Sequence, residues 1–112
     1  MDIKLGEFTS SLEWKRTRKS VRFVVKREDT YLIIMSKTGY PMIPGGGIEI
    51  GESHIEAGVR ELKEETGSIA IGEPKYIGRF LVSRQDVFEE GYYYETEHIY
   101  YSSDVADEGD AI

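Results

Sequence analysis

The sequence predicts a small α/β domain in which one helix packs on a β-sheet. Three features of the chain lead to this prediction: a capped helical segment near its middle, a glycine-rich stretch before that segment, and runs of β-branched and aromatic residues on both sides. A chain of 112 residues has the length of one domain, so we expect a single domain over residues 1–112.

The first half of the chain predicts a β-hairpin followed by a loop. Val21–Lys26 and Tyr31–Ser36 are β-branched and aromatic runs, and four polar residues separate them. Lys37–Gly47 is rich in proline and glycine and is therefore expected to form a loop. The basic run Lys15–Lys19 is able to contact a phosphate, but we interpret it as a solvated strand or arm.

One helix is predicted between Ser53 and Gly67. Ser53 and Glu56 have the spacing of a capping box, and glycine commonly stands just beyond the end of a helix. Four residues follow helical spacing and are predicted to face the core, namely Ile55, Val59, Leu62 and Thr66.

The second half of the chain predicts two longer strands, Lys75–Ser83 and Tyr92–Ser102, around a polar turn at Gln85–Gly91. Tyrosines are concentrated in this half, and we interpret them as packing residues rather than as a base-stacking surface. The acidic tail Asp104–Ile112 shows no convincing element and is expected to be frayed or truncated.

Composition excludes several classes of function. The formal net charge of -7 repels polyanions, so no nucleic-acid polymer is expected as a partner, and a phosphorylated ligand requires a cation. The absence of cysteine excludes disulfides, thiolate ligands and thiol catalysis. No stretch has the character of a secretory signal or a membrane span, so a cytoplasmic protein without a membrane partner is expected.

The predicted helix carries three carboxylates within one narrow arc. Glu61, Glu64 and Glu65 stand at i, i+3 and i+4, a spacing that destabilises a helix by about 0.2–0.5 kcal/mol for each pair of like charges. Lys63 lies on the opposite side, and Arg60 is expected to reach only Glu64. A bound Mg²⁺ or Mn²⁺ would turn this repulsion into attraction, since both ions prefer oxygen ligands and bridge to phosphates.

The glycines before the helix favour close approach of a ligand. Gly45, Gly46 and Gly47 offer backbone amides and carbonyls without side chains, and they are therefore candidates for substrate binding. Taken alone they are typical of a flexible turn, and the acidic residues alone are typical of a solvated helix face. The two features gain significance because one directly follows the other.

The region from Gly46 to Gly67 follows the pattern G-x5-E-x7-R-E-U-x-E-E-x-G-U, where U is a bulky aliphatic residue. The matching residues are Gly46, Glu52, Arg60, Glu61, Leu62, Glu64, Glu65 and Gly67. This pattern resembles the motif of the Nudix hydrolase family of MutT-like proteins. One position departs from it, because Ser68 stands at the last aliphatic position and Ile69 follows, so the aliphatic anchor is expected to shift by one residue.

The resemblance implies a Nudix-type α/β/α sandwich with a mixed β-sheet. Family members usually continue into a further helix, which this chain is expected to lack, either through truncation or because the fold is trimmed or covered by a partner. The implied activity is metal-dependent hydrolysis of a pyrophosphate linkage in a nucleoside diphosphate joined to another moiety. The implied partner is a small nucleotide-type substrate, and a homodimer is one expected assembly because homodimers are common in the family.

The resemblance also implies a role for each matching residue. Glu64 and Glu65 are expected to be the principal metal ligands, Glu61 a further ligand or a water-activating base, and Gly46 a carbonyl ligand. Arg60 is expected to orient and partly neutralise the glutamates as part of the catalytic set.

Other residues have softer roles. Glu52, at the entry to the helix, is expected to bind metal through water or to hold the loop. Family members often recruit one more acid, and Glu97 is the candidate here because Glu95 and Glu97 share one face of a predicted strand. His98 should then point to the opposite face, and His54 is interpreted as a surface residue of the first helical turn.

One alternative of a different class remains. The Ser68 departure and the short C-terminus also suit a non-catalytic nucleotide sensor or interaction domain that retains the fold. The identity of the nucleoside diphosphate derivative does not follow from the sequence.

Overall fold

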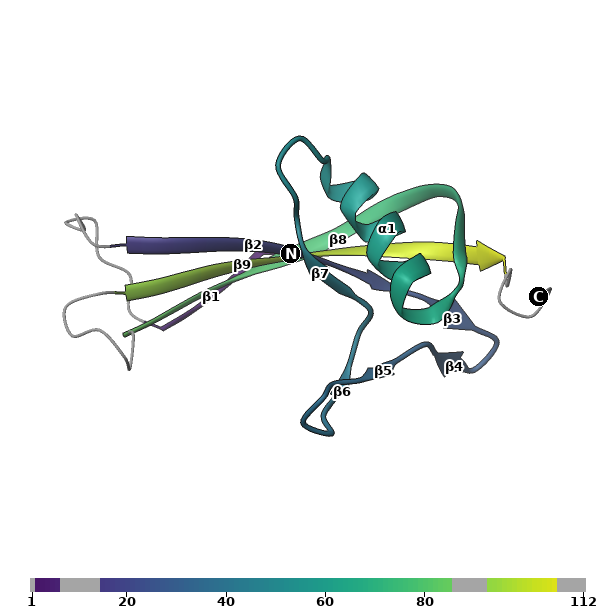
Figure 1. Cartoon of the computed structure of the whole chain (residues 1–112), viewed down its shortest axis with the longest axis horizontal. Helices are drawn as coiled ribbons and strands as arrows, with labels where there is room; N and C mark the ends of the chain where they lie inside the picture. Colours follow the sequence, from purple (N-terminus) through teal and green to yellow (C-terminus); the bar gives the residue numbers. More distant parts are fainter. Residues whose placement is uncertain (1, 7–14, 86–92, 107–112) are drawn as a thin grey trace.

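The computed structural model describes residues 2–6, 15–85 and 93–106. A twisted mixed sheet of five strands carries one helix on one face, and its long strands extend beyond the end of that helix (Figure 1). The elements in chain order are β1 Asp2–Gly6, β2 Lys15–Val24, β3 Lys26–Arg27, β4 Thr30–Tyr31, β5 Ile34–Met35, β6 Pro41–Met42, β7 Gly45–Gly47, α1 His54–Thr66, β8 Ile69–Gln85 and β9 Tyr93–Ala106.

The order of the strands confirms the predicted mixed sheet. The five strands run β1-β8-β9-β2-β7 across the sheet, while β3 with β4 and β5 with β6 form two small separate ribbons. β1 is parallel to β8 and β2 is parallel to β9, whereas β8 with β9 and β2 with β7 are antiparallel. The part of the chain that the structure describes contains one helix, and no helix in it is long and apolar enough to cross a membrane.

The two long strands of the second half are present, but they are longer than predicted. β8 begins directly after the helix, and β9 continues to Ala106. Asp104, Val105 and Ala106 were expected to belong to a frayed tail, yet they pair with Ile71, Ala70 and Ile69. Cross-strand hydrogen bonds from distant residues therefore order a segment whose own sequence has little strand character. The rest of the tail, and the predicted turn from residue 86 onward, lie outside the described residues.

The predicted hairpin forms only at its turn. Lys26 pairs with Tyr31 and Arg27 pairs with Thr30, but the stretch from Val21 to Val24 belongs to β2 and pairs with β9. The prediction of a continuous loop from Lys37 to Gly47 was wrong at its end and also at Pro41–Met42, which forms β6 and pairs with β5. The three consecutive glycines form β7, an edge strand antiparallel to β2, because the extended backbone there completes the ladder of that strand.

The helix has the predicted ends. The Ser53 hydroxyl accepts a hydrogen bond from the Glu56 amide, and the Glu56 carboxylate accepts one from the Ser53 amide, which is the predicted capping box. Gly67 adopts φ 76°, a left-handed conformation that favours glycine, and its amide bonds to the Lys63 carbonyl. Local interactions thus determine both ends of α1.

The core-facing side of α1 differs from the predicted stripe. Ala57, Gly58 and Leu62 are buried, whereas Ile55, Val59 and Thr66 are half-buried. The reason is a close approach: a Cβ atom on Gly58 would lie 2.1 Å from Cε1 of Phe23. The helix therefore rests its glycine on the Phe23 ring, and the core gathers around Val21, Phe23, Val25, Ala57 and Leu62.

The expected shift of the aliphatic anchor after the helix does not occur. Ser68 itself is buried, with 6% of its surface exposed, while Ile69 is half-buried at the start of β8. The Ser68 amide donates a hydrogen bond to the Thr66 hydroxyl, which in turn donates to the Leu62 carbonyl. A polar residue is tolerated at this buried position because no buried side-chain oxygen or nitrogen of the described residues lacks a hydrogen-bond partner.

The two faces of the sheet carry different side chains. Val21 and Phe23 of β2 and Ile99 and Tyr101 of β9 point toward α1, and Tyr101 packs against Phe23 with ring centroids 6.0 Å apart. The alternate residues, among them Ser20 and His98, point to the face that no described helix covers. His98 thus lies on the opposite face from Glu97, as predicted.

Candidate active site

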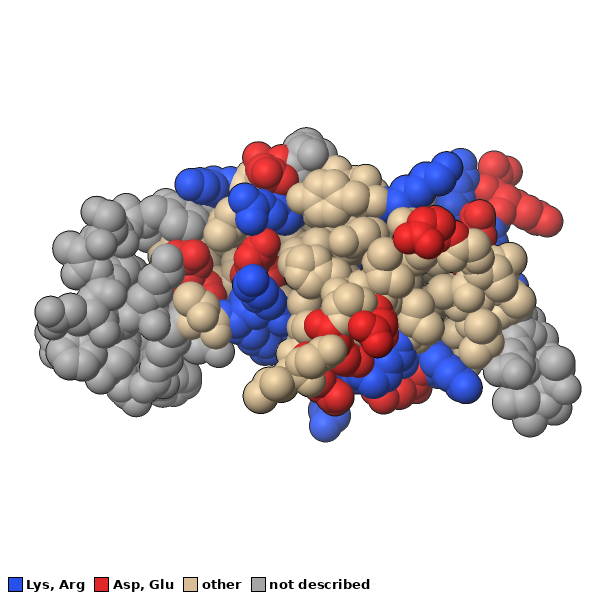
Figure 2. All heavy atoms as spheres, turned by 90° about the horizontal axis from the view of Figure 1, so that it is seen from above, with Lys and Arg blue, Asp and Glu red and all other residues tan. Residues whose placement is uncertain are grey.

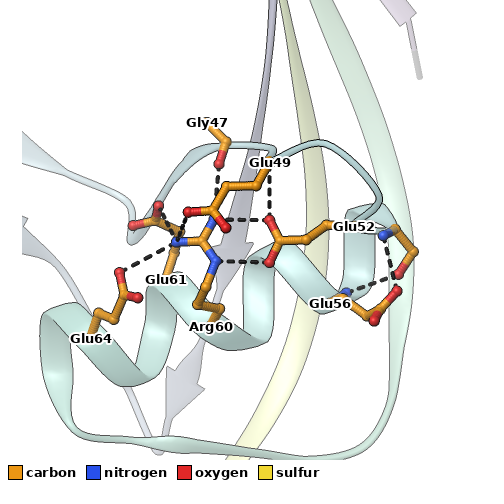
Figure 3. A network of polar contacts seen from close by, with 8 residues as sticks. Gly47, Glu49, Glu52, Glu56, Arg60, Glu61 and Glu64 are labelled. Atoms are coloured by element: carbon orange, nitrogen blue, oxygen red, sulfur yellow. Dashed lines mark hydrogen bonds and ion pairs between the residues drawn. The ribbon is translucent and has the colours of Figure 1, made fainter.

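Arg60 of α1 is the centre of a polar network that joins the helix to the loop before it (Figure 3). Its Nε and Nη2 donate to both carboxylate oxygens of Glu52, at 2.8 and 2.9 Å. Nη1 donates to Glu61 at 3.0 Å and to Glu64 at 3.3 Å. Nη2 also donates to the Gly47 carbonyl at 3.1 Å, so a single guanidinium connects residues from both elements.

The partners of Arg60 correct one prediction. Arg60 was expected to reach only Glu64, but its two-pronged contact is with Glu52, eight residues earlier in the chain. The Glu52 carboxylate also accepts a hydrogen bond from the Glu49 amide at 2.9 Å, so it holds the loop in place. The hydrogen bond from Arg60 lowers the pKa of Glu52, and the same contact raises the pKa of Arg60, so both remain charged.

Gly46 and Glu61 are in direct contact. A Cβ atom on Gly46 would lie 2.7 Å from both Cδ and Oε1 of Glu61, so the absence of a side chain leaves room for this carboxylate. The Glu61 side chain is 18% exposed and is held on its other side by Arg60. The structure thus brings together two of the residues predicted as ligands, Gly46 and Glu61.

The outer edge of β7 is satisfied by side chains. The Gly45 amide donates to Glu65 at 2.8 Å, and the Gly45 carbonyl accepts from Arg22 at 3.0 Å. Hydrogen-bonded pairs alternate along an antiparallel ladder, and the bonds from Phe23 to Pro44 and from Ile48 to Lys19 fix that alternation. Val21 and Gly46 are therefore a hydrogen-bonded pair, and the Gly46 carbonyl points toward Val21. If this carbonyl also ligated a metal, it would have to use the lone pair that the strand hydrogen bond leaves free.

The three helical carboxylates are in different environments. Glu64 is 58% exposed and Arg60 is its recorded partner, whereas Glu65 lies against β7. Burial raises the pKa of Glu65 above its usual value, although the Gly45 amide works in the opposite direction. Carboxylate oxygens are suitable ligands for Mg²⁺ or Mn²⁺. Within the described residues, however, no group of three acidic or histidine side chains is gathered closely enough to hold an ion.

One face of the molecule carries a mixture of acidic and basic side chains (Figure 2). Seen from above Figure 1, acidic and basic side chains lie next to one another rather than in one continuous field (Figure 2). Glu97, the candidate for a further acid, accepts a hydrogen bond from Arg79 at 3.1 Å, and Arg79 also lies 3.5 Å from Asp2. This arginine ties Glu97 to β8 and β1, and no recorded contact joins Glu97 to the carboxylates of α1 in the described chain.

Two residues near the site were missed by the sequence analysis. Arg22 donates to the carbonyls of Ile43 and Gly45, and Glu49 lies 3.8 Å from Arg60. Arg22 lies within a predicted strand, where its alternation with Val21 and Phe23 already placed it on the opposite face from the core. The pairing of β2 with β7, which brings Arg22 to Gly45, had no signal in the sequence.

A model of the NUDIX domain matches residues 16–111 of the chain. The chain belongs to the Nudix family. The match includes the whole of α1 and the glycine strand before it, together with both long strands of the sheet. The family predicted from the motif is therefore confirmed.

Individual relatives agree with this assignment. Over 68 residues, the Nudix chain is 34% identical to an uncharacterized Nudix hydrolase of Streptomyces coelicolor, covering 61% of this chain and 36% of that protein. A NUDIX hydrolase from Nitrosomonas europaea is similar in structure, with a TM-score of 0.62, 26% identity, and coverage of 81% of this chain and 60% of that chain. A Bacillus subtilis pyrophosphohydrolase has a TM-score of 0.63 at 23% identity, over 88% of this chain and 56% of that chain. The Nudix chain thus spans less than two thirds of each of these three relatives.

Proposed function

We propose that this Nudix chain hydrolyses a pyrophosphate linkage in a nucleoside diphosphate joined to another moiety, with Mg²⁺ or Mn²⁺ as cofactor. The observation that carries the proposal is the position of Glu61, Glu64 and Glu65 on one side of α1, next to a glycine edge strand that Glu61 and Glu65 contact. Membership of the Nudix family supports it. The substrate is a small nucleotide rather than a nucleic-acid polymer, in keeping with the net charge of -7.

The residues of the chain have distinct tasks in this proposal. Glu61, Glu64 and Glu65 supply hard oxygen ligands, and Gly46 leaves the space that the Glu61 carboxylate occupies. Arg60 orients Glu61 and Glu64 and offsets their mutual repulsion, while Glu52 holds Arg60 and the loop. When bound, the metal polarises a phosphoryl oxygen and lowers the pKa of a water molecule.

Substitution of Glu64 tests the proposal. Because this side chain is 58% exposed and its recorded partner is Arg60, Glu64→Gln should leave the fold intact. Turnover of any accepted substrate should fall by at least about a hundredfold, since a charged ligand is replaced by a neutral one. Glu73→Gln, an exposed substitution with the same change of charge, serves as the control. Full activity of Glu64→Gln would refute the assigned site.

A nucleotide sensor is the second candidate, and one observation favours it. Arg60 already occupies Glu61 and Glu64, and the described carboxylates are not gathered around an ion site. A panel of nucleotide sugars, dinucleoside polyphosphates, ADP-ribose and nucleoside triphosphates, assayed with Mg²⁺ or Mn²⁺, separates the two candidates. Product release identifies a hydrolase, whereas binding of a nucleotide without product identifies a sensor.

A further inference from the structure

The face of the sheet opposite α1 carries two arginines and one histidine near one another, Arg18, Arg22 and His98. Arg18, Ser20 and Arg22 alternate along β2 and therefore point to this face, and Ser20 lies next to His98 of β9. The Ser20 hydroxyl, on a residue only 1% exposed, is 2.7 Å from Nδ1 of His98. This hydrogen bond fixes the imidazole ring and leaves its Nε2 edge as the free edge in the described structure.

The arginines on this face differ from those on the helix side. Arg60 and Arg79 are each paired with carboxylates. Among the described residues, Arg18 and Arg22 form no salt bridge. Arg22 donates hydrogen bonds to the carbonyls of Ile43 and Gly45, and its charge acts on Glu65 without direct contact. The neighbouring positions on this face bring no carboxylate, since they are Thr96 and Tyr100 of β9 and Gly78, Phe80 and Val82 of β8. In a chain with a net charge of -7, two guanidinium groups that form no salt bridge within the described residues create a local site of positive potential.

The three glycines of β7 lie between this basic face and the carboxylates of α1, and they have no side chains. Gly45 is bonded to Arg22 through its carbonyl and to Glu65 through its amide. At Gly47, a Cβ atom would lie 3.9 Å from Nη2 of Arg18, while the carbonyl of the same glycine accepts from Arg60. Because β7 has no side chains, Arg18 and Arg22 lie one strand away from the carboxylates of the candidate metal site.

We propose that Arg18, Arg22 and His98 form an anion subsite that holds a phosphate group beyond the linkage that is cleaved. Guanidinium groups match the geometry of phosphate oxygens, and the imidazole of His98, whose Nδ1 is bonded to Ser20, offers one more polar contact. The preferred substrates are accordingly nucleotides with three or more phosphates in one chain, rather than nucleotides that end in a neutral sugar. This inference rests on the proposed function for the position of the cleaved linkage, but the subsite itself can be tested without turnover.

Inorganic tripolyphosphate, added with a chelator and without divalent metal, is the probe. The chain has two histidines, so the ring protons of His98 can be followed by NMR and assigned with His98→Gln, while His54 on the helix side is an internal reference. Tripolyphosphate should shift the His98 signals and leave those of His54 almost unchanged. A larger response of His54, or none at His98, would overturn the proposal.

A matched pair of variants tests whether tripolyphosphate binding depends on the charge of Arg18 in particular or on the net charge of the chain. Arg18→Ala and Lys19→Ala remove one positive charge each from adjacent exposed residues that point to opposite faces of β2. Arg18→Ala should weaken tripolyphosphate binding about tenfold, and Lys19→Ala less than about twofold, because only Arg18 lies on the proposed subsite. Equal losses in the two variants would mean that net charge alone attracts the anion, and would refute the subsite.

Kinetic measurements extend the same comparison to nucleotides. Arg18→Ala should raise the KM for nucleoside triphosphates or dinucleoside polyphosphates about tenfold with little change in kcat, and should leave the KM for a nucleotide sugar unchanged. An equal rise for both kinds of substrate would contradict the assigned specificity. If the wild-type chain hydrolyses no nucleotide but tripolyphosphate still shifts His98, the proposed function fails while the subsite stands.

Discussion

The two faces of the five-stranded sheet are stabilised by different physical interactions. On the face covered by α1, Gly58 rests on the Phe23 ring so closely that no methyl group fits between them. On the other face, a buried hydroxyl and a half-buried imidazole form a hydrogen bond between two parallel strands. The first arrangement depends on shape and should be independent of pH, whereas the second depends on a group that titrates.

The largest expected effect is on the covered face. Gly58→Ala places a Cβ atom 2.1 Å from Cε1 and 2.4 Å from Cζ of Phe23. The higher helix propensity of alanine would stabilise α1 by about 1 kcal/mol, but overpacking costs more, so we expect a net loss of about 2–3 kcal/mol. Denaturant unfolding measures this loss as a lower midpoint at constant slope.

A second variant checks the origin of that loss. In a Phe23→Leu background the ring is absent, so Gly58→Ala should cost less than half as much as in the wild type. If the loss is the same in both backgrounds, or if Gly58→Ala stabilises the chain, the contact between helix and sheet is not the one described.

The next effect concerns the polar network beside that contact. Arg60→Gln removes the cation shared by Glu52, Glu61 and Glu64, so the three carboxylates repel one another and the loop loses its anchor. The thermal midpoint should fall, and the fall should be larger at low ionic strength. Lys63→Gln, which removes an exposed charge from the same helix, should change the thermal midpoint little. A similar fall in both variants would show that the fall comes from the lost positive charge and not from the hydrogen bonds of Arg60.

A smaller effect is expected at the contact between β7 and α1. Gly46→Ala forces the Glu61 carboxylate to move, and since this group is the end of a flexible side chain, the loss should be about 1 kcal/mol. In a Glu61→Ala background the same substitution should be nearly neutral. Thermal unfolding of the wild type, the two single variants and the double variant completes the cycle. If the two losses of stability simply add in the double variant, Gly46 and Glu61 are not in direct contact.

The smallest effect belongs to the open face. Burial, together with Arg22 and Arg18, lowers the pKa of His98 below the ordinary value of 6.5. The unfolded chain therefore binds a proton that the folded chain does not, and stability should decrease as pH falls below about 6.5. The thermal midpoint between pH 7.5 and 5.5 should fall less in His98→Gln than in the wild type or in His54→Gln. Identical profiles for all three would remove His98 as the titrating group.

The site was predicted unequally well from the sequence. The spacing of Glu61, Glu64 and Glu65 on one helix, and the glycines before it, follow from the sequence because a helix fixes the relative positions of residues three and four apart. The main partner of Arg60 was not predictable in this way. Glu52 lies outside the helix, and its distance from Arg60 depends on the path of the loop that β7 and the Glu49 amide determine.

By itself, the sequence determined the helix, its two ends and the family of the fold. The caps at Ser53, Glu56 and Gly67 are hydrogen bonds between residues at most four apart, so they need no other part of the chain. Only the tertiary structure decided that three glycines form an edge strand, that β9 extends to Ala106, and that Ser20 meets His98. These contacts join residues 23 to 78 positions apart in the chain, and they form because the sheet must satisfy its backbone hydrogen bonds as a whole.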